Sequence, residues 1–246
     1  MFAQVADRVH RLTHGIANFY LVEDAGKLIL VDAGTPKDWH LFAQAVQALG
    51  HRVDDLDAVL LTHAHADHVG FAERARTTTG ARVLVHRSDE EMARTGKAGA
   101  PNEGKVTSYL LKGQLYKTFW NLAMGGATKT IPVKEISAFG DGETLDVPGR
   151  PRVVHAPGHT TGSAALLLDD RSVLFTGDVM CTHNPLTGRP GPQIMPSGLN
   201  RDTQQAMRSL DNLAGVKADV LLAGHGDPWT AGVDEAIRLA RSAGPS

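Results

Sequence analysis

Apolar positions at the start of the chain follow first a strand pattern and then a helix pattern. Residues 16–22 and 27–32 are two short apolar runs separated by Asp24-Ala25-Gly26, a turn-forming segment, so they predict a β-hairpin. Residues 39–49 place apolar side chains at helical spacing and end at Gly50. This spacing predicts a helix directly after the hairpin.

A β-turn-α-β unit follows, and a second series of strands fills the other half of the chain. The continuous apolar run 58–62 predicts a buried strand, and a histidine-rich turn and a helix lead from it to a strand at 82–85. Further strands are predicted at 134–137, 143–147, 152–156, 163–168, 172–175 and 219–223, and further helices at 202–213 and 233–240. Two series of strands that each end in β–α segments predict two sheets packed face to face with helices outside.

Residues 96–130 interrupt this alternation of strands and helices. A stretch rich in Gly, Ala and Pro leads into a segment in which Leu111, Leu115, Phe119 and Leu122 recur at helical spacing. This pattern predicts a helical insertion that ends at Gly125-Gly126. Because no linker divides the chain, we expect a single domain over residues 1–246 that carries the insertion.

Composition and charge exclude several classes of protein. The 246 residues are 42% hydrophobic and 21% charged, which is typical of a globular chain rather than a disordered one. Lys and Arg total 25 against 27 Asp and Glu, so the overall charge provides no basis for nucleic-acid or membrane partners. The single cysteine, Cys181, excludes an intrachain disulfide and fits a reducing cytoplasm. The first residues lack the layout of a signal peptide, and no apolar run is long enough to cross a membrane.

The 12 histidines are unusual beside 3 Trp and 3 Tyr, and several of them cluster. The segment Thr62-His63-Ala64-His65-Ala66-Asp67-His68 follows a predicted strand and begins a helix. In such a turn alternate side chains point the same way, so His63 and His65 can reach one ion, and Asp67 and His68 a second. Three more candidates each follow a strand end beside a glycine: His159, Asp178 and His225. Together these residues predict a metal centre rather than ordinary surface histidines.

On these residues the sequence resembles the metallo-β-lactamase superfamily over most of its length, from about residue 16 to His225. The H-x-H-x-D-H motif of that family is complete here. The resemblance implies an α/β fold, a four-layer αββα sandwich, with a dinuclear site between the sheets. It implies that His63, His65 and His159 bind the first metal, that Asp67, His68 and His225 bind the second, and that Asp178 bridges them. By the same resemblance Asp32 is a strand-end aspartate close to the site.

The ligand types point to hydrolysis by a metal pair. Imidazole and carboxylate ligands suit zinc and also iron or manganese, and we expect two zinc ions. Two such cations activate a shared water and polarise the bond under attack, so no serine or cysteine nucleophile is needed. Asp67 is a candidate proton acceptor, and Cys181 is expected to be a buried apolar filler. A metal-stabilised binding module is the non-enzymatic alternative, but a closed structural zinc site typically has four ligands, often including cysteine.

Departures from known branches of the family narrow the substrate. Zinc β-lactamases with a cysteine ligand carry it where this chain has Asp178, so the chain is more similar to the glyoxalase II and lactonase branch. True glyoxalase II has a C-terminal glutathione-binding domain, for which few residues remain after His225. We therefore expect hydrolysis of an ester, thioester or lactone of a small molecule.

Two other reactions of the superfamily remain alternatives. A persulfide dioxygenase uses one iron held by two His and one Asp, a subset of the residues present here. A phosphodiesterase or RNA-processing nuclease would need an RNA-binding arm. The insertion does contain lysines, but four lysines along a mostly apolar helix are more typical of its solvated face. These lysines are Lys105, Lys112, Lys117 and Lys129.

Two expectations concern substrate contacts. Lactonases of the family use a tyrosine in the loop after the bridging aspartate; this chain has none there, so His183 is a candidate for that electrophilic role. The insertion, with Phe119 and Trp120, is longer than a connection between two strands requires. We expect it to form a lid over the metal cleft, with a homodimer contact through the same segment as a further expectation. The alternative is a helix packed on its own domain, remote from the site.

Overall fold

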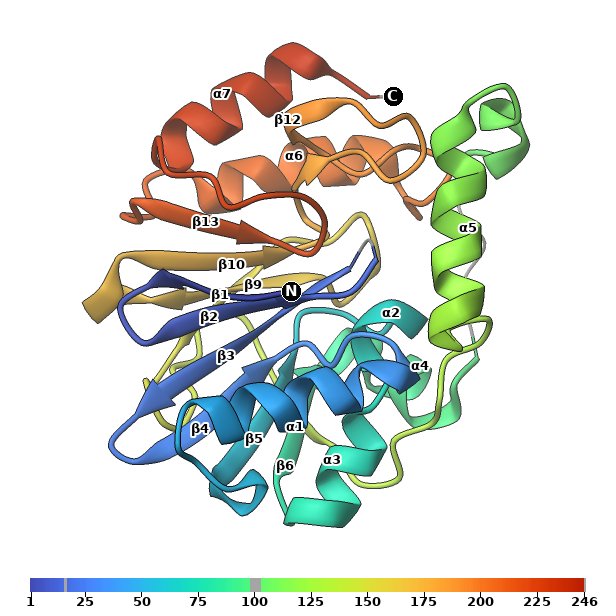
Figure 1. Cartoon of the computed structure of the whole chain (residues 1–246). Coiled ribbons are helices and arrows are strands. Elements are labelled where there is room, and N and C mark those ends of the chain that lie inside the picture. Colours follow the sequence, from blue (N-terminus) through green and yellow to red (C-terminus); the bar gives the residue numbers. More distant parts are fainter. Residues whose placement is uncertain (16, 98–102, 246) are drawn as a thin grey trace.

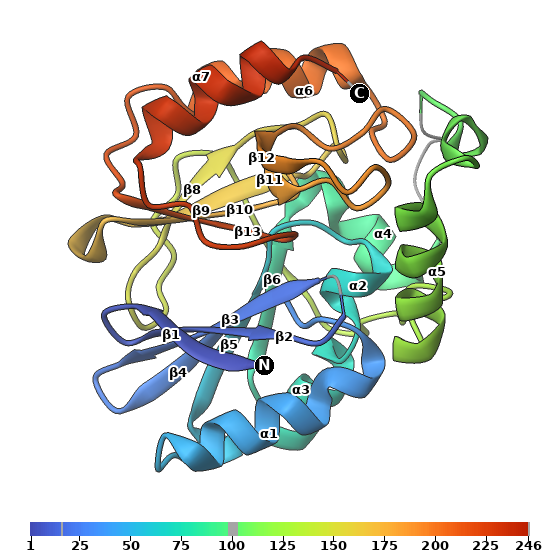
Figure 2. The ribbon, with the colours of Figure 1, turned by 45° about the horizontal axis from the view of Figure 1, so that its top comes forward.

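Two β-sheets lie face to face, and helices cover their outer sides (Figure 1). The computed structural model describes residues 1–15, 17–97 and 103–245. Figure 2 shows the same order of layers from a second direction, with α1 and α3 beyond one sheet and α6 and α7 beyond the other. The predicted four-layer αββα sandwich is therefore confirmed.

The first sheet has seven strands in sequence order, antiparallel from β1 to β4 and parallel from β4 to β7. Its strands are β1 (Phe2–Ala6), β2 (Val9–Thr13), β3 (Asn18–Asp24), β4 (Lys27–Val31), β5 (Leu56–Leu61), β6 (Arg82–His86) and β7 (Ser137–Phe139). Parallel strands end at the same edge of a sheet, so the loops after β4, β5 and β6 lie together.

The second sheet has the strand order β13-β10-β9-β8, with β10 and β13 parallel and the other pairs antiparallel. Its strands are β8 (Arg152–His155), β9 (Ala164–Leu168), β10 (Val173–Gly177) and β13 (Val220–Ala223), and β11 (Cys181–His183) pairs separately with β12 (Pro190–Gln193). The loops after β8, β10 and β13 meet the loops of the first sheet at the edge that carries the histidines.

The helices follow the periodicity of the sequence. The α-helices are α1 (Trp39–Ala48), α2 (Ala66–Val69), α3 (Ala72–Thr79), α4 (Glu90–Thr95), α5 (Gly113–Gly125), α6 (Thr203–Leu213) and α7 (Val233–Ala243). Short 3-10 turns are η1 (Pro36–Asp38), η2 (Val53–Asp55), η3 (Arg87–Asp89), η4 (Val106–Tyr109) and η5 (Asp169–Arg171). The helix of the predicted insertion, α5, lies at one side of the molecule, alongside both halves of the sandwich (Figure 1).

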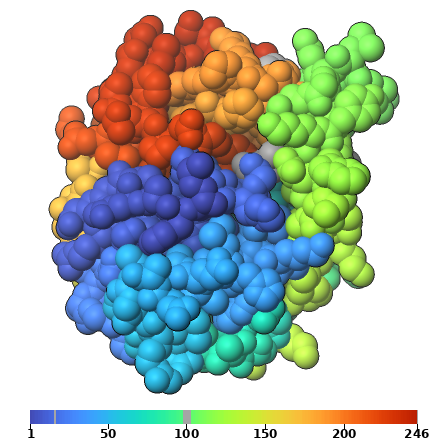
Figure 3. Space-filling view, viewed as in Figure 1, coloured from blue at the N-terminus to red at the C-terminus, as the bar shows by residue number. Residues whose placement is uncertain are grey.

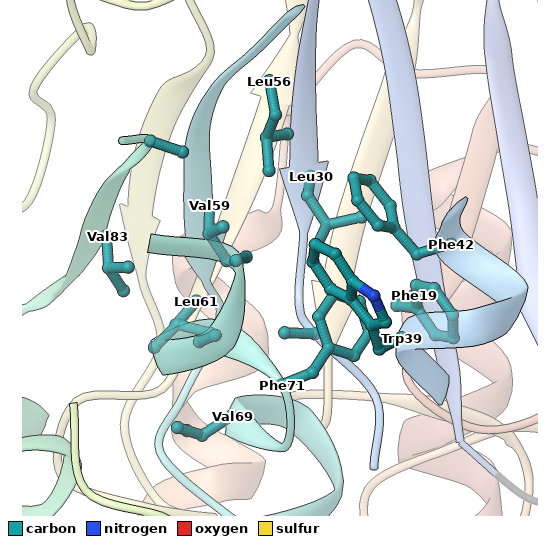
Figure 4. Packing of buried hydrophobic residues seen from close by; sticks show 14 of the residues in the cluster. Phe19, Leu30, Trp39, Phe42, Leu56, Val59, Leu61, Val69, Phe71 and Val83 are labelled. Atoms are coloured by element: carbon teal, nitrogen blue, oxygen red, sulfur yellow. The ribbon is translucent and has the colours of Figure 1, made fainter. Parts of the chain in front are cut away.

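Each sheet has apolar side chains on both faces, so one face packs against the other sheet and the opposite face packs against helices. Alternate residues of a strand point to opposite faces. In β3, Phe19 packs in the cluster under α1, whereas Tyr20 packs between the two sheets. Phe19, Trp39, Phe42 and Phe71 form an aromatic group between the first sheet and its helices (Figure 4). A third cluster joins the second sheet to α6 and α7.

Several element predictions need correction. The strand predicted at 134–137 begins only at Ser137, and the strand predicted at 143–147 is reduced to one bridge between Thr144 and Arg152. Strands β1, β2, β11 and β12 and the helix α4 were not predicted. Parts of two predicted segments, Ile16 in the hairpin and 98–102 in the insertion, lie outside the described residues.

Candidate metal centre

Seven side chains converge where the loops of the two sheets meet. The loop after β5 and the short helix α2 belong to the first sheet's side, and the loops after β8, β10 and β13 come from the second sheet. These segments carry His63, His65, Asp67, His68, His159, Asp178 and His225. The structure therefore brings together all seven residues that the sequence singled out as metal ligands.

The possible ligand atoms form three overlapping groups. In each group the atoms lie within 4.8 Å of one another: His63, His65 and His159; His63, His68 and Asp178; and Asp67, His68 and His225. Such groups match the spacing that one metal ion needs from its ligands. The first and third groups agree with the two sets that the family resemblance implied.

Asp178 lies between these groups. Its Oδ2 is 3.3 Å from His159 Nε2 and 3.2 Å from His225 Nε2. Its two carboxylate oxygens are 3.8 Å from His63 Nε2 and 3.6 Å from His68 Nε2. Gly224, which precedes His225 in the loop after β13, lets Asp178 lie this close to His225, because a Cβ at position 224 would overlap the Asp178 carboxylate. A carboxylate in this position can face two ions at once.

Unpaired buried atoms test whether cations fit the centre. Within the described part of the chain, His63 Nε2, His68 Nε2 and Asp178 Oδ1 are buried without a hydrogen-bond partner. Buried polar atoms without a partner are costly, and here all three belong to residues of one ligand group, His63, His68 and Asp178. Imidazole nitrogens and carboxylate oxygens are ligands of divalent metal ions, so the residues at this centre fit metal binding.

Burial and neighbouring charges shift the pKa values of the candidate ligands in different directions. Burial and the neighbouring His65 lower the pKa of His159 to about 3, so this ring is neutral at pH 7. Burial would raise the pKa of Asp178, but His225 and His68 lower it well below its ordinary value, so the carboxylate is ionised. Burial likewise opposes a charge on His68, yet Asp178, Asp67 and Asp32 raise its pKa to about 10. A proton on His68 therefore occupies the position where a cation would bind.

Asp32 orients His68 from behind the centre. It follows β4 and is 1% exposed, and its Oδ2 accepts a hydrogen bond of 2.9 Å from His68 Nδ1. Its carboxylate also accepts from the backbone N–H and the hydroxyl of Thr62, each at 2.8 Å. With a proton on Nδ1, Nε2 of His68 is directed at the other ligands.

A second buried carboxylate, Asp89, was missed by the sequence analysis. It lies in η3, is 1% exposed, and accepts hydrogen bonds from Ala64 N at 3.1 Å and from Thr160 Oγ1 and Gly162 N at 2.7 Å each. It thus ties the loop that carries His63 and His65 to the loop that carries His159. An Asp four residues after the predicted strand 82–85 was the available signal, but it has no motif of its own.

A cavity of about 440 Å³ opens on the centre. Its polar wall includes His65, Asp67, His159, Asp178 and His225, and its apolar wall includes Phe119, Leu122, Leu186, Met195 and Leu199. One face of α5 therefore covers the cavity, as expected of a lid. The predicted stripe of Leu111, Leu115, Phe119 and Leu122 is not one buried face, however, because Leu111 is 99% exposed and Phe119 is 50% exposed.

His183 is placed differently from the expectation. It lies on β11 and lines an adjoining cavity of about 220 Å³ with Arg11 and Lys117, and among the residues described Pro185 and His225 alone line both cavities. His183 therefore does not line the cavity at the metal centre, where an electrophilic role would place it. Cys181 is fully buried, and burial raises the pKa of its thiol, as expected of an unreactive filler.

Comparisons with known proteins match the geometry. The pattern of the metallo-beta-lactamase superfamily matches residues 12–225. The chain is 29% identical to "Probable metallo-hydrolase YflN" of Bacillus subtilis over 92% of this chain and 87% of that protein. It is similar to the solved metallo-beta-lactamase family protein TTHA1429 of Thermus thermophilus, with 27% identity, a TM-score of 0.67, and coverage of 96% and 79% of the two chains. A B3 metallo-beta-lactamase with an active-site glutamic acid shares the fold at 20% identity and a TM-score of 0.69, with 98% and 89% covered.

Proposed function

The chain belongs to the metallo-β-lactamase superfamily, and from that membership we propose that it is a dinuclear zinc hydrolase. Its substrate is a small molecule with an ester, thioester or lactone bond and an apolar acyl part. The observation that carries this proposal is the position of Asp178 between imidazoles from both sides of the centre, with an apolar wall opposite.

The seven candidate ligands described above would hold the two zinc ions. Zinc bound there would lower the pKa of a water molecule toward neutrality and polarise the carbonyl group of the substrate. His63 and His159 are neutral because burial lowers their pKa values, so both present lone pairs without losing a proton first. Asp178 remains ionised and balances positive charge between the two halves of the centre.

Asp67 is the residue best placed to move a proton. Its side chain is 15% exposed and lines the cavity, and its Oδ2 lies 3.7 Å from His225 Nε2. It can therefore accept a proton from the attacking water and return it to the leaving oxygen or sulfur. The other residues at the centre are more deeply buried than Asp67 or lack a carboxylate.

The apolar wall selects the other part of the substrate. Phe119, Leu122 and Met195 line the cavity opposite the ligands. They exclude water from the acyl group and hold its carbonyl against the centre. An acyl chain of several carbons fits this wall better than a phosphodiester, because no arginine lines the cavity among the described residues and Lys129 is its single lysine.

Metal analysis and a substrate panel test the proposal. Protein purified without chelator should contain about two zinc ions per chain, and Asp178→Ala should lose both and lower turnover by several orders of magnitude. The panel compares esters, thioesters and lactones of increasing acyl length with a phosphodiester and a β-lactam. Asp211→Ala, a change to an exposed residue paired with Arg241, is the matched control and should behave as wild type.

Two results would contradict the proposal. Turnover of the phosphodiester alone would assign the centre to nucleic-acid or related chemistry. One iron per chain, together with oxygen uptake on addition of a persulfide, would assign it to a dioxygenase.

A further inference from the structure

The outward side of the insertion exposes large apolar side chains. The surface that we call the apolar α5 face consists of Leu110 and Leu111, just before α5, and of Tyr116, Phe119, Trp120 and Met124 on α5, each at least 50% exposed. With Met1, these are the exposed large hydrophobic residues of the described chain. Tyr116, Trp120 and Met124 are spaced by four residues on α5 and so form one stripe along it. Grouped apolar exposure of this kind marks an interaction surface.

The charge around this face has one sign. Between Glu103 and Glu135 the sequence has no acidic residue, although the whole chain carries a net charge of −2. Five lysines lie in that interval, all of them exposed: Lys105, Lys112, Lys117, Lys129 and Lys134. None of them forms an ion pair in the part of the chain that the structure describes. The balanced total charge therefore hides a local basic region around an apolar surface.

The segment also projects from the molecule, so its apolar side chains can enter another surface. Figure 3 shows it as a lobe that projects beyond the body of the molecule. A projecting helix that combines Trp, Tyr, Leu and Met with lysines is typical of helices that lie in the plane of a membrane surface. At 13 residues α5 is too short to span a bilayer, and among the described helices none is both long and apolar enough to do so.

We propose that the apolar α5 face docks on an anionic phospholipid surface. The apolar side chains enter the headgroup region, and the lysines contact the lipid phosphates. A second copy of the chain fits the face less well, because symmetric packing of two such segments would bring lysines against lysines. The docking itself does not depend on the proposed hydrolysis. Phe119 belongs both to this face and to the cavity wall, so docking would bring the mouth of the cavity close to the lipid.

Vesicle binding of the full, metal-loaded chain tests the proposal. The vesicles are phosphatidylcholine alone or equal parts of phosphatidylcholine and phosphatidylglycerol, and the bound fraction is measured by sedimentation. We expect binding to the mixed vesicles that is about tenfold or more stronger than to phosphatidylcholine and that weakens as salt is added. Trp120→Ser, and separately Lys112→Glu with Lys117→Glu, should each reduce binding about tenfold or more.

The matched control makes the same change of charge at two lysines elsewhere on the surface. Lys27→Glu with Lys217→Glu changes two exposed lysines outside the insertion, and it should bind the mixed vesicles nearly as well as wild type. All variants should retain the wild-type melting temperature, since the changed side chains are exposed. Absence of wild-type binding, or equal loss in the control, would overturn the proposal. A dimer in sedimentation velocity that Trp120→Ser dissociates would also overturn it, in favour of a second copy as the occupant.

Discussion

Replacing Asp32 by Asn should weaken metal binding while leaving the fold in place. The backbone N–H of Thr62 donates to Asp32 Oδ1 at 2.8 Å, whereas the Thr62 hydroxyl and His68 Nδ1 both donate to Oδ2, at 2.8 Å and 2.9 Å. An Asn oxygen in the Oδ1 position keeps the bond from the Thr62 backbone N–H, and the Thr62 hydroxyl can turn to accept from the NH2 group. The NH2 group then faces His68 Nδ1, which must become an acceptor, so the ring proton moves to Nε2.

The magnitude follows from that exchange of tautomers. His68 Nε2 belongs to two of the three ligand groups, and a proton there must leave before a metal can bind. Loss of a carboxylate partner behind a ligating histidine typically lowers metal affinity about 10- to 100-fold. This range corresponds to about 1.4 to 2.8 kcal/mol of binding free energy.

The assay is zinc competition with a chromophoric chelator, which resolves the affinities of two sites. Asp38→Asn is the matched control: Asp38 is a buried carboxylate, 2% exposed, that accepts hydrogen bonds from Thr35 and contacts none of the seven ligands. The reasoning is refuted if folded Asp32→Asn binds both ions with wild-type affinity. It is refuted equally if Asp38→Asn weakens binding to the same extent.

Three other predictions follow from named contacts. Asp89→Asn should lower the affinity for the metal ion at His63, His65 and His159 about tenfold, because the new amide NH2 group would face backbone N–H donors. Two unchanged zinc affinities would contradict this prediction. Phe119→Ala should raise KM several-fold at unchanged metal content, whereas Trp120→Ala should leave KM for a dissolved substrate unchanged, and equal effects would argue against the placement of α5. Burial and the stacked His155 lower the pKa of His86 from 6.5 to about 4, so the unfolded chain takes up this proton first and stability should fall as pH drops through that interval. His86→Gln should flatten this part of the pH profile of unfolding free energy, and a profile parallel to wild type would show that other groups cause the loss.

Local pattern was sufficient for most of the fold, and the errors have local causes. The turn between β1 and β2 is Asp7-Arg8, with Arg8 at a φ of 50°, so the glycine or asparagine that usually signals such a turn is absent. Strand β12 has the sequence Pro-Gly-Pro-Gln, which is typical of a loop and is tolerated because the two-stranded pair leaves one edge open. Leu145 and Val147 are buried as their alternation predicts, but the backbone there pairs with its neighbour at a single bridge.

The ligands of the centre could be predicted because each lies beside a strand end or a glycine. Four of them are within six residues, and the remaining three have the same local setting, so spacing along the chain carried the information. Asp89 had no such setting. Its importance arises from hydrogen bonds to Ala64 and Gly162, which are 25 and 73 residues away in the chain.

By itself, the sequence determined most of the strands and helices and their order, the apolar faces that require two covered sheets, and the residues of the candidate metal centre. These properties depend on the periodicity of apolar residues and on short spacings between residues in the chain, so they can be read from local sequence. Only the tertiary structure decided that Asp89 joins the two histidine loops, that His183 faces a different cavity, and that Phe119 lines the site while Trp120 faces outward. Those outcomes depend on how segments far apart in the chain pack together, and a contact between distant segments leaves no periodic trace in either one.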